Sequence, residues 1–340
     1  MASNQSTDLD DEPDVEVMGS MSDDTFFQFI FVSLVLVPSV VSSLGIIFNI
    51  INIVVFVKMG FSETINISLL GLAVADVGVL LTMVGFSVIY NPVLLTSVAN
   101  MDVINAVNYV ALGWPHVLFS RIVACLTTYI TFERFLCVVM PLKVKAIITP
   151  TKTVAVVTGI YSFIILSLIP AFVANQIGLR FNPQLNQTSI GLITAPNANL
   201  LEDVSLTITN IVEISSFVLI VIFTAGLIQT FARTSAWRNK SSSASKSKSS
   251  SRDKVLIKMV LFISLVYIVC SFPDVAGTVA MLFVKDFSVK GRERNVFVSA
   301  FAVFFNISSL HSTASLFIYI KMSSRFQQNF AALCGKVKLR

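Results

Sequence analysis

The sequence contains few charged residues. Asp, Glu, Lys and Arg make up 13% of its 340 residues, whereas apolar residues make up 55% and the mean hydropathy is +0.82. Soluble domains carry about 25% charged residues, so this composition excludes an ordinary soluble protein and indicates a chain mostly embedded in a membrane. We interpret the net charge of +5 as a sign of membrane topology and not of nucleic-acid binding.

Patterns typical of enzymes and metal sites are also missing. We find no Gly-rich phosphate loop, no nucleophile–base motif and no His, Cys or carboxylate cluster with metal-ligand spacing. We therefore expect a protein that is not an enzyme and needs no cofactor or metal. Alternating patterns of about ten residues, which a transmembrane strand requires, are absent too.

Seven apolar runs are long enough to cross a ~30 Å hydrocarbon core, which takes about 20 helical residues. They lie at 27–57, 66–90, 104–138, 150–174, 203–232, 254–284 and 295–321. Backbone exposed to lipid must form hydrogen bonds within its own segment. The sequence therefore predicts an all-α membrane protein whose residues 26–322 form a seven-transmembrane helix bundle in the lipid bilayer.

Basic residues set the expected orientation, because they favour the cytoplasmic side. They gather between Arg233 and Lys258 and near the carboxy terminus, whereas the first 24 residues hold eight acids and no Lys or Arg. Residues 1–25 are therefore expected to be an acidic, disordered, extracellular amino terminus without a cleavable signal peptide. In this orientation the sequons at Asn4 and Asn186 are exposed to glycosylation, whereas those at Asn66, Asn239 and Asn306 are not.

Two cytoplasmic segments have a distinct composition. Residues 241–251 are rich in Ser with interspersed Lys, so we predict a disordered loop at 234–253 that kinases modify; a plain flexible linker is the alternative. Residues 323–340 contain Phe326 and Phe330 at i and i+4 beside basic positions, which predicts an amphipathic helix on the inner leaflet. Cys334 at its end is a candidate for palmitoylation.

The segment Ile130–Leu142, with Glu133-Arg134 at the end of an apolar run and Pro141 seven residues later, closely resembles the third helix of rhodopsin-like G-protein-coupled receptors. In that family the acid restrains the arginine in the inactive receptor, and the arginine meets the G protein when the helices open. The resemblance continues at Asn49 in helix one, at Asp76 in helix two and at Pro273 in helix six. In helix seven it is reduced to Tyr319, because Ser315-Leu-Phe-Ile-Tyr319 replaces the usual Asn-Pro-x-x-Tyr.

The chain departs from this family in two further respects. The four cysteines all lie outside the expected extracellular loops, so the usual disulfide between helix three and the loop 175–203 is missing, and we expect that loop to be less ordered. No lysine occupies the middle of helix seven, so an opsin is not expected. Several short segments of the sequence, for example Trp114-Pro-His116, resemble those of the molluscan chemosensory receptors.

Charged residues in the outer half mark a candidate ligand pocket. Arg121 lies 13 residues before Arg134, about 20 Å above it, where an unpaired charge would be costly. Glu213 in helix five lies at a similar depth and is the expected partner. The two form either a structural ion pair or a recognition site for a charged or zwitterionic ligand. His116 is expected at the outer mouth, and Asp274 in the outer half or on the helix surface.

Asp76 is expected in mid-membrane, where an acid is functional by default. The neighbours that we predict are Asn49, Ser312, Ser315 and His311. In the family that this chain resembles, this acid joins polar groups of helices one, three and seven around a sodium ion. Val123 stands here at the helix-three position that the resemblance leads us to expect as a hydroxyl, so we favour a polar switch network over a sodium site. His311 is either a pH-sensitive member or a neutral, hydrogen-bonded residue.

These features predict a plasma-membrane receptor that binds an extracellular small-molecule or peptide ligand and activates a heterotrimeric G protein, with a chemosensory role and with kinases and arrestin acting on the Ser-rich loop 241–251. One alternative is a neuropeptide receptor of the same fold. The other is a seven-helix channel or transporter, for which an internal repeat is expected and none is found. The ligand and the G-protein subtype cannot be read from the sequence.

Overall fold

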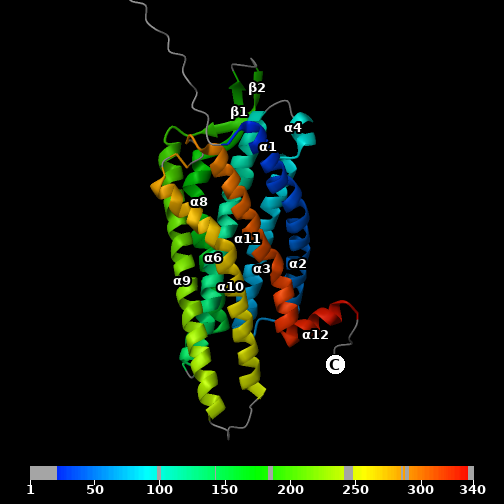
Figure 1. Ribbon diagram of the computed structural model, residues 1–340, viewed down its shortest axis with the longest axis vertical. Helices are drawn as coiled ribbons and strands as arrows, with labels where there is room; N and C mark the ends of the chain where they lie inside the picture. Colours follow the sequence, from blue (N-terminus) through cyan, green and yellow to red (C-terminus); the bar gives the residue numbers. More distant parts are fainter. Residues whose placement is uncertain are drawn as a thin grey trace, which may run out of the picture.

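The computed structural model describes residues 21–97, 101–141, 143–182, 187–240, 248–284, 286–287 and 291–335. In these ranges seven helical spans are long and apolar enough to cross a membrane: Asp24–Met59, Thr64–Ile89, Asp102–Val139, Pro150–Ala174, Ala198–Arg233, Val255–Phe283 and Arg294–Met322. They lie side by side in an elongated bundle (Figure 1). The predicted seven-helix fold class is confirmed, and the ends of the spans differ from the predicted runs by only a few residues.

Two of the spans are composite. The first consists of α1 (Asp23–Ile30), the π-helix η1 (Phe31–Leu36) and α2 (Val37–Met59), and the third consists of α5 (Met101–Ala106), the π-helix η2 (Val107–Gly113) and α6 (Trp114–Val139). The other spans belong to α3 (Thr64–Ile89), α8 (Pro150–Ala174), α9 (Ala198–Lys240), α10 (Lys248–Phe283) and α11 (Arg294–Met322). Short helices α4 (Pro92–Ser97) and α7 (Val144–Ile147) lie in loops, and α12 (Ser324–Leu333) follows α11.

The sequence explains several of these boundaries. Gly60 ends α2 with a φ of 78°, a conformation that glycine adopts without steric cost. Pro150 occupies the first position of α8, where a missing N–H costs nothing, and the Thr149 side chain before it accepts a hydrogen bond from the Lys152 N–H at 3.4 Å. Ser323 caps α12 in the same way, through the Phe326 N–H at 3.2 Å.

Small residues bring the helices into close contact. The α3 helix packs against α2 and α6, α6 packs against α9, and α10 packs against α9 and α11. At Gly78 of α3 an added Cβ would collide with the Phe119 ring of α6. Close approach at small residues is a usual basis of helix association in lipid, where the hydrophobic effect between helices is absent.

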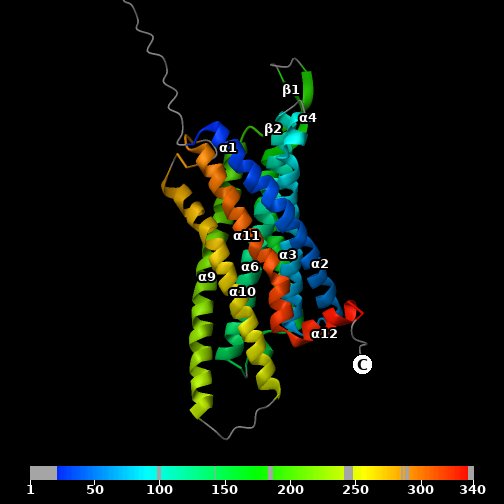
Figure 2. The same cartoon turned by 45° about the vertical axis from the view of Figure 1, so that its right-hand side comes forward.

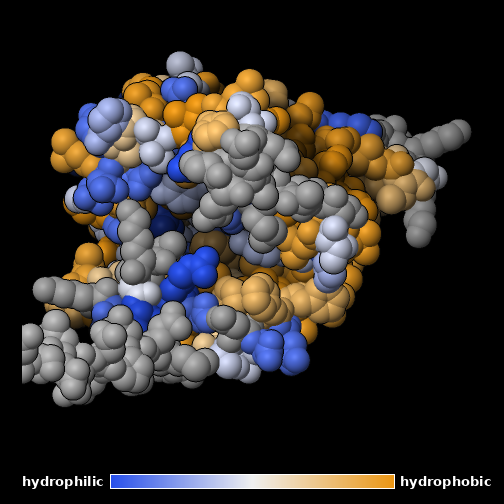
Figure 3. Space-filling view, turned by 90° about the horizontal axis from the view of Figure 1, so that it is seen from above, coloured by the Kyte–Doolittle hydropathy of each residue, from blue (hydrophilic) through white to orange (hydrophobic). Residues whose placement is uncertain are grey.

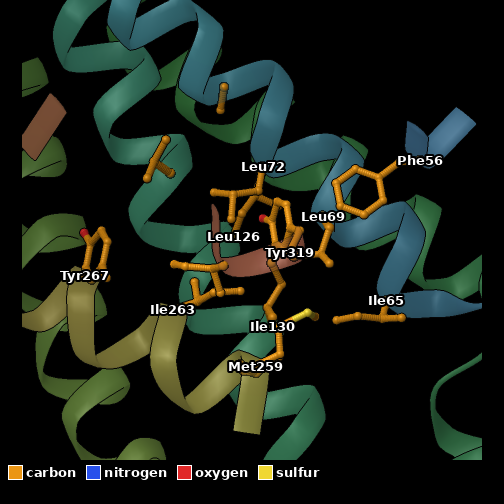
Figure 4. Packing of buried hydrophobic residues seen from close by; sticks show 14 of the residues in the cluster. Phe56, Ile65, Leu69, Leu72, Leu126, Ile130, Met259, Ile263, Tyr267 and Tyr319 are labelled. Carbon is orange, nitrogen blue, oxygen red and sulfur yellow. The ribbon is translucent and has the colours of Figure 1, made fainter. Parts of the chain in front are cut away.

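The main apolar core lies in the half of the bundle nearer to α12, which we call the inner half. Figure 4 shows Leu72 of α3, Leu126 and Ile130 of α6 and Ile263 of α10 around Tyr319 of α11. The Tyr319 ring is only 1% exposed. The rings of Phe56 and Phe326 lie 5.2 and 5.5 Å from it, so α2, α11 and α12 share one aromatic cluster.

The loop after α8 folds differently from the expectation of lower order. It forms an antiparallel hairpin of β1 (Asn175–Asn182) and β2 (Gln187–Thr194) that stands at the end of the bundle opposite α12, which we call the outer end (Figures 1 and 2). The run from Gln176 to Phe181 alternates polar or small residues with Ile, Leu and Phe, a pattern that favours a strand. Main-chain pairing therefore orders this loop although the chain forms no disulfide there.

At the other end, α9 and α10 extend beyond the remaining helices (Figure 2). The disordered loop predicted at 234–253 is replaced in part by helix, since α9 reaches Lys240 and α10 begins at Lys248. Residues 241–247 lie outside the described residues. The predicted amphipathic helix is present as α12, with Phe326 buried, and α12 lies across the end of the bundle.

Apolar side chains cover much of the surface. Many large hydrophobic residues of the spans are exposed, for example Leu166 at 62% and Ile211 at 62%, as expected where lipid is the solvent. Seen from the outer end, hydrophobic residues occupy much of the rim and hydrophilic residues gather toward one side of the interior (Figure 3).

Candidate ligand and switch sites

A buried charge cluster lies in the outer half of the bundle. Arg121 of α6 forms an ion pair with Glu213 of α9, with 2.7 Å between Arg121 Nη1 and Glu213 Oε1. Asp274 of α10 lies on the same guanidinium, with 3.8 Å from Nη1 to its Oδ2. The structure thus brings together three charged residues, of which the sequence had predicted only the Arg121–Glu213 contact.

The cluster joins three helices. Thr278, one turn beyond Asp274 in α10, donates a hydrogen bond from Oγ1 to Glu213 Oε2 at 3.0 Å. Both oxygens of Glu213 therefore have a partner, and α10 is tied to α9 through Glu213 as well as to α6 through Arg121. Arg121 keeps one buried donor, Nε, without a hydrogen-bond partner in the described residues.

The sequence predicted His116 at the outer mouth, but the structure buries it inside the bundle. It is 2% exposed, its Nδ1 lies 2.8 Å from the Thr82 hydroxyl of α3, and its ring packs 4.3 Å from the Phe305 ring of α11. The error arose from counting depth along one helix, because the π-helix η2 and the neighbouring α3 and α11 enclose this turn. His116 therefore belongs to the contact between helices, and it lies close enough to Arg121 to interact with its charge.

Asp76 is the centre of a polar network in the inner half. The Ser312 hydroxyl donates to Asp76 Oδ1 at 2.7 Å, and Asn49 Nδ2 donates to the Ser312 carbonyl at 2.8 Å. Ser315 donates to Asn49 Oδ1 at 3.1 Å. The predicted neighbours Asn49, Ser312 and Ser315 are thus found together, linking the first, second and seventh spans. Asn52 was missed.

Asn52 joins this network by donating to Ser315 Oγ at 3.0 Å. Its position three residues after Asn49 places it on the same helix face, and this spacing could have predicted that it joins the network. His311 lies elsewhere: its ring packs edge-on against Tyr267, with the centroids 5.1 Å apart, so the expected contact with Asp76 is not found. Among the described residues no group of three or more His, Cys, Asp or Glu could hold a metal ion.

The end of α6 near Val139 carries a second ion pair. Arg134 Nη2 lies 2.5 Å from Glu133 Oε1, and Glu133 is fully buried. Glu133 also accepts a hydrogen bond from the Thr64 hydroxyl of α3. One turn inward, the Thr131 and Ser264 hydroxyls lie 2.6 Å apart and join α6 to α10. The second, third and sixth spans are therefore held together around Arg134.

A cavity of about 1150 Å³ opens beside this pair, at the same end of the bundle. Its walls include Glu133, Arg134 and Tyr319, together with residues of α3, α10 and α12. Pro273 lies inside α10, where a proline removes one main-chain hydrogen bond and permits a bend. A bundle with a buried outer site, a hinge-capable helix and a cavity at the opposite end has the parts of a transmembrane receptor.

A comparison of the sequence with known protein families agrees with this receptor architecture. The sequence model of the 7 transmembrane receptor (rhodopsin family) matches residues 49–319, which cover most of the chain, from Asn49 of the polar network to Tyr319 of the aromatic cluster. The protein therefore belongs to the rhodopsin family of seven-transmembrane receptors, which implies a ligand, a G protein and the membrane as partners. A search of curated proteins found no match.

The remaining predicted sites lie at the ends and loops of the chain. Cys334 is exposed directly after α12. Asn4 and Asn186 lie outside the described residues. So do positions 241–247 of the Ser-rich loop, whereas 248–251 begin α10.

Proposed function

We propose that this receptor stands in the plasma membrane with its amino terminus outside, binds an extracellular chemical ligand at the Arg121 cluster and activates a heterotrimeric G protein in a chemosensory role. Ligand binding shifts a two-state equilibrium of the bundle. In the ligand-bound state, α10 moves outward about Pro273, Arg134 leaves Glu133 and the cytoplasmic cavity widens.

One observation carries this proposal. Arg134 is a cation held 2.5 Å from an acid at the wall of a cavity that opens to the cytoplasmic end. The Thr131–Ser264 contact ties α10 to the same turn of α6, so an outward movement of α10 breaks a contact next to the arginine. Small changes of contact in the outer half can therefore alter whether the Arg134 guanidinium is free to bind a partner at the cytoplasmic face.

The test is Arg134→Ala in cells that co-express several G proteins. We expect ligand-driven and basal nucleotide exchange to be lost while surface expression is retained. Lys58→Ala, which removes an exposed cation from the last turn of α2, is the matched control and should signal normally. Unchanged signalling in Arg134→Ala would remove the proposed coupling role.

A peptide ligand is the second candidate, and the hairpin favours it. Ile177, Leu179, Phe181 and Ile190 lie on one face of β1 and β2 and are 41–72% exposed. An exposed two-stranded sheet with an apolar face can accept an extended peptide as a further strand. If the ligand is such a peptide, Leu179→Ser should weaken its response, whereas the response to a small molecule bound among the spans should not change.

We also propose three modifications. Cys334, exposed at the end of α12, suits palmitoylation, and the Ser-rich loop 241–251 suits kinases and arrestin. Asn4 and Asn186 are the proposed glycosylation sites. Mass spectrometry of the receptor purified from its membrane tests all three.

A further inference from the structure

Two acids face one arginine in the outer cluster. Glu213 and Asp274 both lie on the Arg121 guanidinium, and the two carboxyl groups are also within hydrogen-bond reach of each other. If all three groups are ionised, the cluster carries one negative charge in excess. Like charges at such a distance repel strongly where water is excluded, so the excess charge has to be balanced, by a proton held between the two carboxyl groups or by a further cation.

The two acids differ in how fully they are engaged. Glu213 has Arg121 on one oxygen and Thr278 on the other, at 2.7 and 3.0 Å, and its side chain is 4% exposed. Asp274 lies 3.8 Å from Arg121, which is too long for a hydrogen bond, and its side chain is 10% exposed. A molecule that reaches the cluster therefore meets Asp274 as the less engaged acid.

Arg121 supplies a second, independent sign of a ligand. The residue is 8% exposed, and its Nε–H is buried with no hydrogen-bond partner in the part of the chain that the structure describes. A buried donor without a partner costs about 1–3 kcal/mol. An oxygen acceptor on a ligand would satisfy this donor, which belongs to the same guanidinium that faces Asp274.

We infer that the outer cluster binds a small organic cation, an amine that also carries an uncharged oxygen acceptor, with its ammonium on Asp274 and its oxygen on Arg121. This inference rests on the ligand site of the proposed function and gives its ligand class. An amino alcohol supplies both groups and brings the net charge of the cluster to zero. A zwitterionic amino acid supplies both groups but leaves the excess negative charge in place.

One aromatic side chain near the cluster suits such a ligand. Tyr267 of α10 lies close enough to Arg121, Glu213 and Asp274 to interact with their charges. Aromatic faces attract organic ammonium groups. The apolar part of the amine is therefore expected to lie against Tyr267.

The experiment uses full-length receptor in detergent micelles and measures thermal unfolding against four compounds with one carbon skeleton. These are phenylalaninol, phenylalanine, N-acetyl-phenylalaninol and amphetamine, which keeps the ammonium but lacks the oxygen. We expect saturable stabilisation by phenylalaninol, and half-maximal stabilisation by the other three compounds only at concentrations at least tenfold higher. Amphetamine lacks the oxygen acceptor, N-acetyl-phenylalaninol lacks the ammonium charge, and phenylalanine leaves the excess negative charge in place. Sodium chloride in place of the amine shows whether a simple cation suffices.

Variants locate the effect. Asp274→Asn should weaken the phenylalaninol midpoint by at least tenfold, Asp274→Glu should retain part of it, and Asp203→Asn, which neutralises an exposed acid of α9, should leave it unchanged. Equal stabilisation of the unsubstituted protein by phenylalanine or by the N-acetyl compound would overturn the inference. So would stabilisation by sodium to the same extent. Because unfolding does not depend on a G protein, loss of coupling in Arg134→Ala and loss of amine binding are separate results.

Discussion

Arg121 and Glu213 bury opposite charges between α6 and α9, with Asp274 beside them. Removing Arg121 leaves two buried acids without their cation, and removing one partner of a buried pair typically costs about 3–5 kcal/mol. We therefore expect Arg121→Met to lower surface expression and ligand response strongly, and Glu213→Gln to lower them less, because Asp274 still faces Arg121. The double variant should lose less than the sum of the two losses, because Glu213→Gln removes one of the two acids that Arg121→Met leaves without a cation.

A double-mutant cycle on surface expression and ligand potency measures this coupling. The same cycle between Arg121→Met and Asp203→Asn serves as control, since Asp203 is exposed on α9 and should give additive losses. Additive losses for Arg121 and Glu213 would mean that the pair does not form in the membrane.

Depth along a helix predicted some contacts of these residues and failed for others. Counting 1.5 Å per residue placed Arg121 at the level of Glu213, and the cost of an unpaired charge then required the pair. It could not place His116, whose neighbours Thr82 and Phe305 come from helices distant in sequence. Thr278 was not predicted for a different reason. A buried hydroxyl carries no charge, so no large energetic penalty requires it to have a partner.

Among the elements, α12 is anchored in two different ways. Phe326 is fully buried between Phe56 and Tyr319, whereas Arg325, which is partly exposed, forms a 2.5 Å ion pair with Glu63. Loss of a buried Phe side chain costs about 3–5 kcal/mol, and an exposed ion pair contributes about 0–1 kcal/mol. Phe326→Ala should therefore release α12, and Arg325→Met should have little effect.

Hydrogen exchange of the α12 amides distinguishes the two variants. Protection should fall by orders of magnitude in Phe326→Ala and by less than about tenfold in Arg325→Met, following these energies. Equal loss of protection in both would show that the ion pair, and not the aromatic cluster, holds the helix.

The β1–β2 hairpin is held by polar contacts where other members of the family use a disulfide. Asn175 donates from Nδ2 to Glu202 Oε1 at 2.7 Å, and Tyr109 of η2 also forms a hydrogen bond with Glu202. All four cysteines are free. We therefore expect dithiothreitol to leave the unfolding temperature unchanged, whereas Glu202→Ala should lower it and increase hydrogen exchange in β1, since bonds to a charged group contribute about 1.5–3 kcal/mol.

Asp203→Asn, at the next position of α9, is the control for Glu202→Ala. A receptor that dithiothreitol destabilises would contradict this account of the hairpin. The sequence predicted that the disulfide is missing but not what replaces it, because Asn175 and Glu202 lie 27 positions apart and neither belongs to a recognisable pattern.

For the whole molecule, the decisive property is which end faces outward. Asn66 is buried with its Nδ2 on the Gly60 carbonyl, and Asn306 donates to the Ser33 carbonyl of η1. Neither side chain is free for an oligosaccharide. Endoglycosidase mapping combined with Asn→Gln variants should find sugar at Asn4 or Asn186 alone. Sugar on Asn239 would place the basic loops outside and contradict the proposed orientation.

The length of α10 beyond its proline has a mechanical consequence. Pro273 and Lys248 belong to one helix and are 25 residues apart, which corresponds to about 38 Å at 1.5 Å per residue. A bend of about 10° at Pro273 would therefore carry the Lys248 end through roughly 6–7 Å, more than one helical turn of 5.4 Å. Near the hinge, at Asp274, the same bend shifts atoms by less than about 1 Å. The helix thus works as a lever with a short outer arm, so a ligand needs only to change contacts slightly to produce a large displacement on the opposite side of the membrane.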